Sequence, residues 1–376
     1  MQLVIHLIAL LKLNMDKILF VLLVCAFCNS PILAQDSLKY QFVNGNTLTV
    51  LGRAAGISPN VFHRVDSADQ KKLPPRVAEL SDNSAGISIN FQTNSKSIKV
   101  KWVLGKYMNL WNMTPVAVNG LDMYGWKNQH WQYVASARPL SDTNSVVIIS
   151  NLDGNMNTFR IYLPLYSELK TIEIGVIHGS IIKKAGQEFM PKKKVVVYGS
   201  SITQGASASR PGMAYPSIVS RDLNVETFNL GFSGTGKMEI AMADILAKMD
   251  ADVYILDCVP NPSPKQIHDR AVPFIKRLRE LKPDIPIILV ESLFREDGNW
   301  NSVKGNYVTN QNKEFRQAYE QLVGEKVQKL YYVSNSNLIG DDHEATVDGT
   351  HFTDLGFTRF ANHIENVLIK ILKMKG

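Results

Sequence analysis

The sequence predicts a two-part protein in which an all-β sandwich precedes an α/β domain built on a parallel sheet. The chain has 376 residues, which is enough to bury two cores. Between residues 36 and about 180, short segments alternate apolar and polar residues, as strands with one buried face do. From about residue 190 onward, short apolar runs alternate with helical patterns, which is typical of a parallel sheet covered by helices on both faces.

Composition places the chain among globular proteins, with 45% hydrophobic and 20% charged residues and a net charge of +7. The basic residues are densest at Lys183, Lys184 and 192–194, and they interleave with no aromatic platform. This pattern indicates a solvated linker, so we expect no nucleic-acid partner.

Residues 1–34 have the pattern of an export signal. Lys12 and Lys17 precede an apolar run at 18–27, and small and polar residues follow up to Ala34. The run is too short for a stop-transfer helix, and no later segment is apolar enough to span a membrane. We expect cleavage after Ala34 and a protein exported to the periplasm, the cell surface or the medium.

Two alternatives stay open at this end of the chain. The segment around Cys25 weakly resembles a lipoprotein processing site, and Met15 is an alternative start because a complete signal follows it. Cys25 and Cys28 both lie in the expected signal, so the mature chain keeps only Cys258 and forms no internal disulfide. We expect Cys258 to be a small buried hydrophobe rather than a nucleophile.

The β-sandwich domain is expected over residues 35–185. Strands are predicted at 87–91, 98–102, 145–150, 159–163 and 171–177. Few helical patterns interrupt them, and a polar turn at 94–96 separates the first two.

The α/β domain is expected over residues 190–376. Strands are predicted at 195–198, 225–230, 253–257, 285–291 and 330–334, and helices at 264–281, 306–323 and 355–372. Ser263 and Pro264 form a good N-cap and first turn for the first of these helices. Because ligands bind outside the carboxyl ends of such strands, the candidate site residues are those that follow the strands.

A serine just after the first strand of this domain is the candidate nucleophile. The stretch VVVYGSSITQG (195–205) leaves its β pattern at Gly199 and presents Ser201. A serine hydroxyl needs a base, and the base needs a third group to hold its tautomer. Asp348 and His351 precede the last predicted helix with a spacing that lets the carboxylate turn back on the imidazole.

Attack on an acyl group also requires N–H donors for the oxyanion. The turn GFSGTG (231–236) offers backbone N–H groups, and Asn261, after the third strand, offers a side-chain amide. The turn lacks the spacing and the acidic partner of a dinucleotide fingerprint. No His or Cys cluster has metal-ligand spacing, so we expect neither cofactor nor metal.

Four blocks in this order resemble those of the SGNH or GDSL-type hydrolases. They read GSSITQG (199–205), NLGFSG (229–234), DCVPN (257–261) and DGTH (348–351). The resemblance implies that Ser201, His351 and Asp348 are catalytic and that Ser201, Gly234 and Asn261 form the oxyanion hole. The alternatives without catalysis are that Ser201 caps a helix, that His351 is a surface residue and that Asp348 is a turn residue. The four ordered blocks together favour catalysis.

The stretch GLDMY (120–124) resembles the Gly-x-Asp-Leu-Tyr motif of a β domain that precedes some SGNH esterases, with Met123 in place of Leu. The combined resemblance covers nearly all of the mature chain. It implies a three-layer α/β/α (flavodoxin-like) hydrolase domain with a parallel sheet, preceded by an all-β, jelly-roll-like sandwich.

Two departures from the hydrolase pattern stand out. Ser200 replaces the Asp of the first block, and Pro260 and Pro262 flank Asn261 in the third. The first departure changes a local hydrogen-bond partner, and the second means that the third block lacks the usual Gly-x-Asn-Asp form around Asn261.

Four further residues are weaker candidates for substrate contacts. They are Asp122, Tyr124, Glu291 and Arg295. For Asp122 and Tyr124 the structural alternative is a fixed turn in the sandwich, and for Glu291 and Arg295 it is a salt bridge between the two.

The sequence thus predicts an exported serine esterase that hydrolyses short-chain acyl esters, above all O-acetyl groups on carbohydrates. Four tryptophans of the β domain (Trp102, Trp111, Trp126 and Trp131) offer either sugar stacking or core packing. A catalytically silent glycan-binding protein is one alternative. A lipase or lysophospholipase-type acylhydrolase is another, although the sequence shows no long apolar lid.

Overall fold

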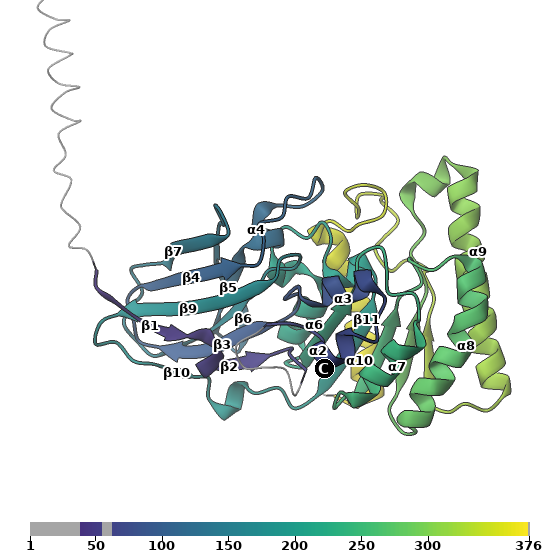
Figure 1. The fold of residues 1–376 in the computed structure, drawn as a ribbon, viewed down its shortest axis with the longest axis horizontal. Coiled ribbons are helices and arrows are strands. Elements are labelled where there is room, and N and C mark those ends of the chain that lie inside the picture. The colour runs from purple at the N-terminus through teal and green to yellow at the C-terminus, as the bar shows by residue number, and fades with distance from the viewer. Residues whose placement is uncertain (1–37, 55–61, 375–376) are drawn as a thin grey trace, which may run out of the picture. The chain divides into compact units, whose positions relative to one another are not determined.

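The computed structural model describes residues 38–54 and 62–374. The residues from Tyr40 to Gly376 form one compact unit (Figure 1). The expected signal at 1–34, with Cys25 and the cleavage position at Ala34, lies outside the described residues. Within the described ranges, no helix is long and apolar enough to cross a bilayer.

The first part of this unit consists of two antiparallel sheets. In spatial order the first sheet contains β1 (Tyr40–Asn44), β9 (Leu169–Ile177), β4 (Ile98–Leu104) and β7 (Thr143–Ile149). The second contains β10 (Ile182–Lys184), β3 (Ser88–Thr93), β8 (Asn157–Tyr162), β5 (Leu121–Lys127) and β6 (His130–Ala137), and β2 (Thr49–Leu51) pairs with β3. Residues from both sheets, including Phe91 and Trp102, share one core. The predicted sandwich is therefore confirmed, and β1, β2, β5, β6 and β10 were not predicted.

Short helices interrupt the sandwich. They are the 3-10 helices η1 (Gly45–Thr47) and η2 (Gln187–Phe189) and the α-helices α2 (Ser67–Gln70), α3 (Pro75–Ser81) and α4 (Pro115–Asn119). Val77 and Leu80 of α3 are buried in the core of the following α/β part, not in the sandwich core. The segment that carries α2 and α3 is thus shared between the two parts.

The α/β part is built on a five-stranded parallel sheet. Its order is β12 (Glu226–Gly231), β11 (Lys194–Gly199), β13 (Val253–Asp257), β14 (Ile287–Val290) and β15 (Leu330–Val333). In a doubly wound sheet of this order, the switch point between the first and third strands is where ligands bind. Here that point is the carboxyl end of β11 and β13, immediately before Ser201.

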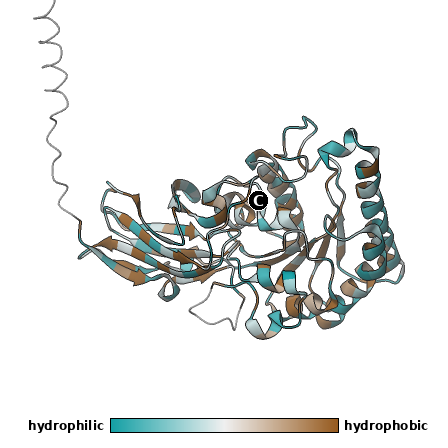
Figure 2. Ribbon diagram, turned by 45° about the horizontal axis from the view of Figure 1, so that its top comes forward, coloured by the Kyte–Doolittle hydropathy of each residue, from teal (hydrophilic) through white to brown (hydrophobic). Residues whose placement is uncertain are grey.

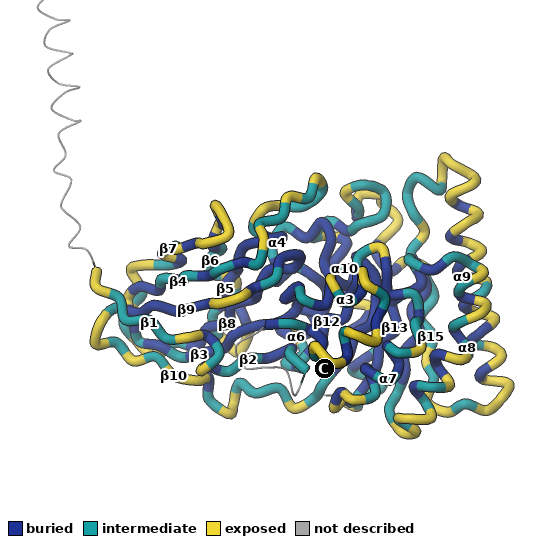
Figure 3. Tube along the Cα trace, viewed as in Figure 1, coloured by how far each residue is buried: buried dark blue, intermediate teal, exposed yellow. Residues whose placement is uncertain are grey.

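Helices cover both faces of this sheet. They are α5 (Ser201–Gln204), α6 (Tyr215–Asp222), α7 (Ile240–Lys248), α8 (Pro264–Leu281), α9 (Ser302–Gly324) and α10 (Asp354–Leu372), with the 3-10 turns η3 (Pro211–Met213) and η4 (Glu296–Asn299). Val195 and Val197 pack in the core that α6 and α10 complete, whereas Val196 and Tyr198 pack in the core of α7, α8 and α9. The apolar strands are buried between helices whose outer faces are polar (Figures 2 and 3). The predicted three-layer arrangement is confirmed.

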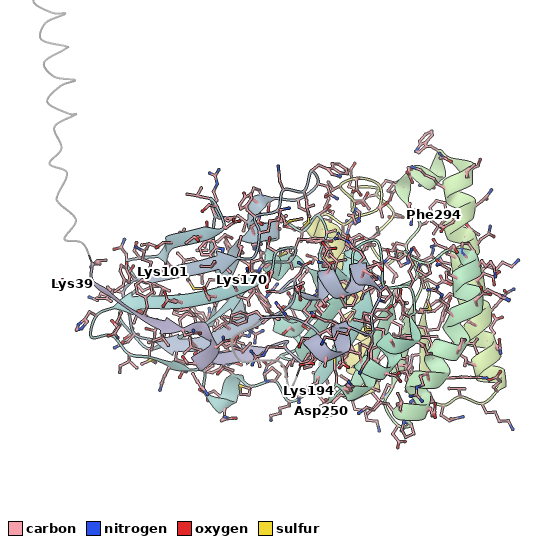
Figure 4. All side chains as sticks on the ribbon, in the orientation of Figure 1. Lys39, Lys101, Lys170, Lys194, Asp250 and Phe294 are labelled. Atoms are coloured by element: carbon pink, nitrogen blue, oxygen red, sulfur yellow. The ribbon has the colours of Figure 1, made fainter. Side chains whose placement is uncertain are left out.

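The amino ends and the carboxyl ends of these parallel strands carry different residues. At the amino edge, Lys194 at the start of β11 pairs with Asp250 at 2.7 Å (Figure 4). Ser201, Gly234 and Asn261, which the sequence selected, follow the carboxyl ends of β11, β12 and β13.

Candidate active site

The local structure around Ser201 explains why a serine follows this strand. The Ser200 hydroxyl caps α5 by accepting a hydrogen bond from the backbone N–H of Ile202 at 3.2 Å. Ser200, which stands where the first block usually has Asp, therefore takes the capping role. Ser201 is the first residue of α5, so its own hydroxyl is not the cap and stays available at the carboxyl end of β11.

Ser201 is hydrogen-bonded to His351, and His351 to Asp348. Ser201 Oγ lies 2.8 Å from His351 Nε2, and His351 Nδ1 lies 2.7 Å from Asp348 Oδ2. The Nδ1–H donates to the carboxylate, which leaves Nε2 as the acceptor for the Ser201 proton. The structure thus brings together the three residues that the sequence selected, in the order that nucleophilic catalysis requires.

Asp348 is held by four hydrogen bonds. Its Oδ1 accepts from the backbone N–H groups of Thr350 (3.1 Å) and His351 (2.8 Å), and its Oδ2 accepts from the His351 ring and from Asn112 Nδ2 at 3.0 Å. Burial alone would raise the pKa of Asp348, but hydrogen bonds from His351 and Asn112 hold this pKa below its ordinary value. Asp348 is therefore ionised at neutral pH. Sequence reasoning missed Asn112, which no motif marks.

Two backbone N–H groups, at the start of α5 and in the turn after β12, have no acceptor among the described residues. Within residues 38–54 and 62–374, nothing accepts a hydrogen bond from the N–H of Ser201 or of Gly234. Gly234 has φ +68°, and a Cβ at this position would meet no atom within 4 Å. A left-handed glycine beside open space lets its N–H approach a ligand closely. Both N–H groups are therefore available to a ligand, and their role as oxyanion donors stays a prediction.

The third predicted donor, Asn261, is placed differently. Its Nδ2 donates to the backbone carbonyls of Phe232, at 3.1 Å, and of Thr235. An amide NH₂ has only two N–H groups, so both are engaged in holding the turn that contains Gly234. The expectation that the Asn261 side chain itself faces the oxyanion needs this correction, because in this structure Asn261 shapes the turn.

Asp122 and Tyr124 are not at the site. The Asp122 carboxylate is fully buried, accepts from the backbone N–H of Gly212 at 3.0 Å and pairs with Arg210 at 3.3 Å. The Tyr124 ring lies under the guanidinium of Arg221, 4.0 Å from its centroid. The motif in β5 therefore binds the β part to the segment around η3 and α6, and neither residue lines the cavity that adjoins His351.

Glu291 and Arg295 do not form the salt bridge that the sequence left open. Glu291 is buried and accepts from Arg316 (2.6 Å), from the Tyr332 hydroxyl (2.6 Å) and from the Asn335 backbone (2.8 Å). Arg295 instead donates to the carbonyl of Pro260 at 3.2 Å. Glu291 is thus fully engaged in the scaffold, and no observation assigns substrate to either residue.

A cavity of about 460 Å³ adjoins His351. One wall is the loop 105–114 between β4 and α4, which presents Met108, Leu110, Trp111, Asn112 and Met113. The lining also includes charged residues, which are Arg76, Glu79, Asp82, Lys106 and Glu168. Of the four tryptophans considered from sequence, Trp111 is 85% exposed and lines this cavity, whereas Trp102 and Trp131 are buried. Core packing explains the latter two.

The remaining candidates carry no site. Cys258 is buried, and burial raises the pKa of its thiol, which agrees with a packing role. In the part of the chain that the structure describes, no group of three or more His, Cys, Asp or Glu side chains is placed to hold a metal ion.

Comparison with known proteins agrees with this geometry. A family model described as GDSL-like lipase/acylhydrolase matches residues 192–369, and a model for the N-terminus of SGNH-hydrolase-type esterases, named GxDLY, matches residues 40–182. A crystal structure from Bacteroides ovatus ATCC 8483, assigned as a GDSL-like lipase, is 45% identical with a TM-score of 0.87, over 90% of this chain and 99% of that one. The chain belongs to the GDSL-like lipase/acylhydrolase family.

More distant relatives share the fold of this GDSL-like protein. A salicylyl acyltransferase from a tetracycline biosynthetic pathway is 17% identical with a TM-score of 0.71, over 89% of this chain and 99% of that one. A family two carbohydrate esterase from Cellvibrio japonicus is 13% identical with a TM-score of 0.59, over 89% and 99%. No curated protein sequence matches the chain. The family assignment makes this GDSL-like protein a carboxylic ester hydrolase.

Proposed function

We propose that this GDSL-like hydrolase removes short-chain acyl groups, above all acetyl, from carbohydrate esters by a serine mechanism. The observation that carries the proposal is the continuous contact from Ser201 Oγ through the His351 ring to Asp348, at 2.8 and 2.7 Å. An unbroken hydrogen-bonded series of nucleophile, base and carboxylate supports turnover rather than a silent glycan-binding protein.

In this mechanism Ser201 Oγ attacks the ester carbonyl carbon while His351 Nε2 takes the hydroxyl proton. The oxyanion accepts hydrogen bonds from the N–H groups of Ser201 and Gly234, which are free to donate. The carbon–oxygen bond to the alcohol then breaks, and His351 returns the proton to the departing alkoxide. Water then attacks the acyl-enzyme while His351 takes its proton. The bond between the acyl carbon and Ser201 Oγ breaks, and His351 returns the proton to Ser201. Throughout, Asp348 holds the Nδ1–H tautomer and stabilises the imidazolium.

The cavity beside His351 supports a polar alcohol part. The departing oxygen must lie near His351 Nε2 to receive its proton, so the cavity next to that ring receives the alcohol. Charged side chains contribute to its lining, which favours a hydroxylated alcohol part over an apolar one, because apolar contact would leave those charges desolvated. An exposed Trp111 beside hydrogen-bonding carboxylates suits a sugar ring, which has an apolar face and a hydroxylated rim.

The test is hydrolysis of acetyl, butyryl and octanoyl esters of one chromogenic alcohol by the mature protein and by Ser201→Ala. We expect kcat/KM to be highest for acetyl, and the Ala variant to lose at least about 10³-fold. A preference for octanoyl would favour the lipase alternative. Turnover that survives in the Ala variant would refute the serine mechanism.

We also propose that residues 1–34 are an export signal, which the charge and apolar pattern of the sequence supports. The mass of the protein recovered from a producing cell tests this. A mature chain starting at Gln35 is expected, a lipid-modified chain starting at Cys25 would point to anchoring, and an intact N-terminus would contradict export.

A further inference from the structure

Asn112 reaches the catalytic carboxylate from the other part of the molecule. It lies on the loop 105–114, which precedes α4 of the β-rich part, and Asp348 lies on the loop that precedes α10 (Figure 1). Asn112 Nδ2 is 3.0 Å from Asp348 Oδ2 and 3.4 Å from His351 Nδ1, across 236 residues of sequence. Asn112 and the His351 ring therefore donate hydrogen bonds to the same oxygen, Oδ2 of Asp348.

The two oxygens of Asp348 are held in different ways. Oδ1 accepts from backbone N–H groups of its own loop, those of Thr350 and His351, so the local sequence secures it. Among the described residues, the donors to Oδ2 are two side chains, the His351 ring and Asn112. Without Asn112, the lone pair of Oδ2 that faces away from the ring has no fixed partner among the described residues.

The loop that carries Asn112 is anchored well enough to position a side chain. Asn119 is fully buried, accepts from the Met108 N–H at 2.8 Å and donates to the Met108 carbonyl at 2.7 Å. The Gly105 N–H donates to the carbonyl of Glu168 at 2.9 Å. At the far end of the loop, the Thr114 hydroxyl donates to the carbonyl of Ser209 at 2.6 Å.

We propose that Asn112 is a positioning residue for the catalytic acid, so that the β-rich part supplies a component of the catalytic centre. The Nδ2–H donation fixes the rotation of the Asp348 carboxylate and favours its ionised form, which in turn holds the His351 tautomer. This inference rests on the proposed function, because it assumes that Ser201, His351 and Asp348 act together.

The test uses two substitutions of Asn112 and a matched control. Asn112→Ala removes the donor, and Asn112→Asp keeps the shape but places a second carboxylate beside Asp348. The control is Asn109→Asp, because Asn109 is exposed on the same loop and its substitution introduces the same charge. The readout is the rate at which a fluorophosphonate ester labels Ser201 between pH 5.5 and 8.5, which needs no knowledge of the natural substrate.

The charge of the introduced carboxylate depends on pH, and this determines the direction in which the labelling rate should change. The groups facing position 112 are Asp348 and His351, and the charged side chains around the adjoining hollows are Arg76, Glu79, Asp82, Lys106, Glu168 and Asp354. At high pH the introduced carboxylate is ionised and repels Asp348, whereas its protonated form donates a hydrogen bond to Asp348 as Asn112 does. We expect labelling of Asn112→Ala to be slower by roughly 10-fold. Asn112→Asp should be slower still at pH 8.5 and approach the wild-type rate as pH falls.

The outcomes separate this inference from the proposed function. Wild-type rates in both Asn112 variants, or an Asn112→Asp deficit that does not change with pH, would refute the positioning role. Wild-type protein that is not labelled, or Ser201→Ala that is labelled equally fast, would refute the proposed function itself. Asn109→Asp should match the wild type at every pH. Thermal unfolding in the same buffers checks the fold, and the uncharged Ala variant keeps the inference testable if the Asp variant unfolds.

Discussion

Asp257 is a buried carboxylate that ties the nucleophile's helix to the sheet. Its Oδ2 accepts from the Thr203 hydroxyl of α5 at 2.7 Å and from the Tyr215 hydroxyl at 3.0 Å. Burial raises the pKa of Asp257 to about 7, although both hydrogen bonds oppose that rise. The residue is thus adapted to anchoring α5 at the end of β13 rather than to carrying a charge.

This shift predicts a pH-dependent stability. Between the ordinary Asp pKa of about 4 and the folded value of about 7, the folded protein binds a proton that the unfolded chain does not. The contribution of Asp257 to stability therefore falls as pH rises through this window. Asp257→Asn has no such proton, so the Tm of the variant minus that of the wild type should increase from pH 4.5 to 8.

Calorimetry across that range provides the measurement. The prediction concerns how the Tm difference between Asp257→Asn and the wild type changes with pH. It does not concern the absolute value of that difference, because the introduced amide adds hydrogen-bond donors of its own. Asp250→Asn is the control, since Asp250 is exposed and Lys194 lowers its pKa, and its difference should stay flat. A flat difference for Asp257→Asn as well would contradict the prediction.

At the scale of an element, the loop 105–114 contacts Asp348 and also lines the cavity beside His351. Asn112 donates a hydrogen bond to Asp348, and its neighbour Trp111 lines both the cavity of about 460 Å³ beside His351 and a second, open hollow of about 540 Å³. An exposed aromatic ring between two hollows is well placed to stack on the alcohol part of a substrate that extends past the catalytic histidine.

We expect Trp111→Ala to lower kcat/KM for an acetylated methyl glycoside by about 10-fold and to leave ethyl acetate unchanged, because only the sugar reaches the ring. A pH-stat assay compares both substrates with the same acyl group. Trp300→Ala is the matched control, since Trp300 is 94% exposed and lines neither hollow. Equal loss on both substrates, or no loss on the glycoside, would show that Trp111 does not bind the sugar.

At the scale of the whole molecule, a buried arginine joins the two parts. Arg64 Nη1 donates to the carbonyls of Asn229 (3.0 Å) and Gly231 (2.6 Å), next to the oxyanion turn. Its other nitrogens donate to Leu80 (2.5 Å) and Asn83 (2.9 Å). Burial lowers the pKa of Arg64 to about 9, which keeps it charged at neutral pH. The β-rich part and the α/β part should therefore unfold together.

Arg64→Met should lower stability by roughly 3 kcal/mol or more, because it leaves several buried carbonyls without donors. In differential scanning calorimetry, we expect one transition in the wild type and one transition at lower temperature in the variant. Arg277→Met is the control, since the ion pairs of Arg277 are partly exposed and contribute little. Two separate transitions, with only one displaced in Arg64→Met, would mean that the parts fold independently.

Local pattern was sufficient to predict the fold class and to select Ser201, His351 and Asp348, which the structure brings into hydrogen-bond contact. Alternation along β4 and continuous apolar runs such as 195–198 reflect strand geometry, which repeats every two residues whatever the rest of the chain does. Asp348 and His351 are three residues apart, so their contact is a local property as well. Ser201 follows a strand end, where the topology of a parallel sheet gathers ligands.

Contacts between distant segments were decided only in the folded molecule. Asn112 and Asp348 are 236 positions apart, α3 packs into the second core, and both Asn261 N–H groups turn to the carbonyls of Phe232 and Thr235. Each of these depends on how loops pack against one another. A single sequence records the periodicity of a segment but not which carbonyl or carboxylate another segment will bring beside it, because that follows from the packing of the complete core.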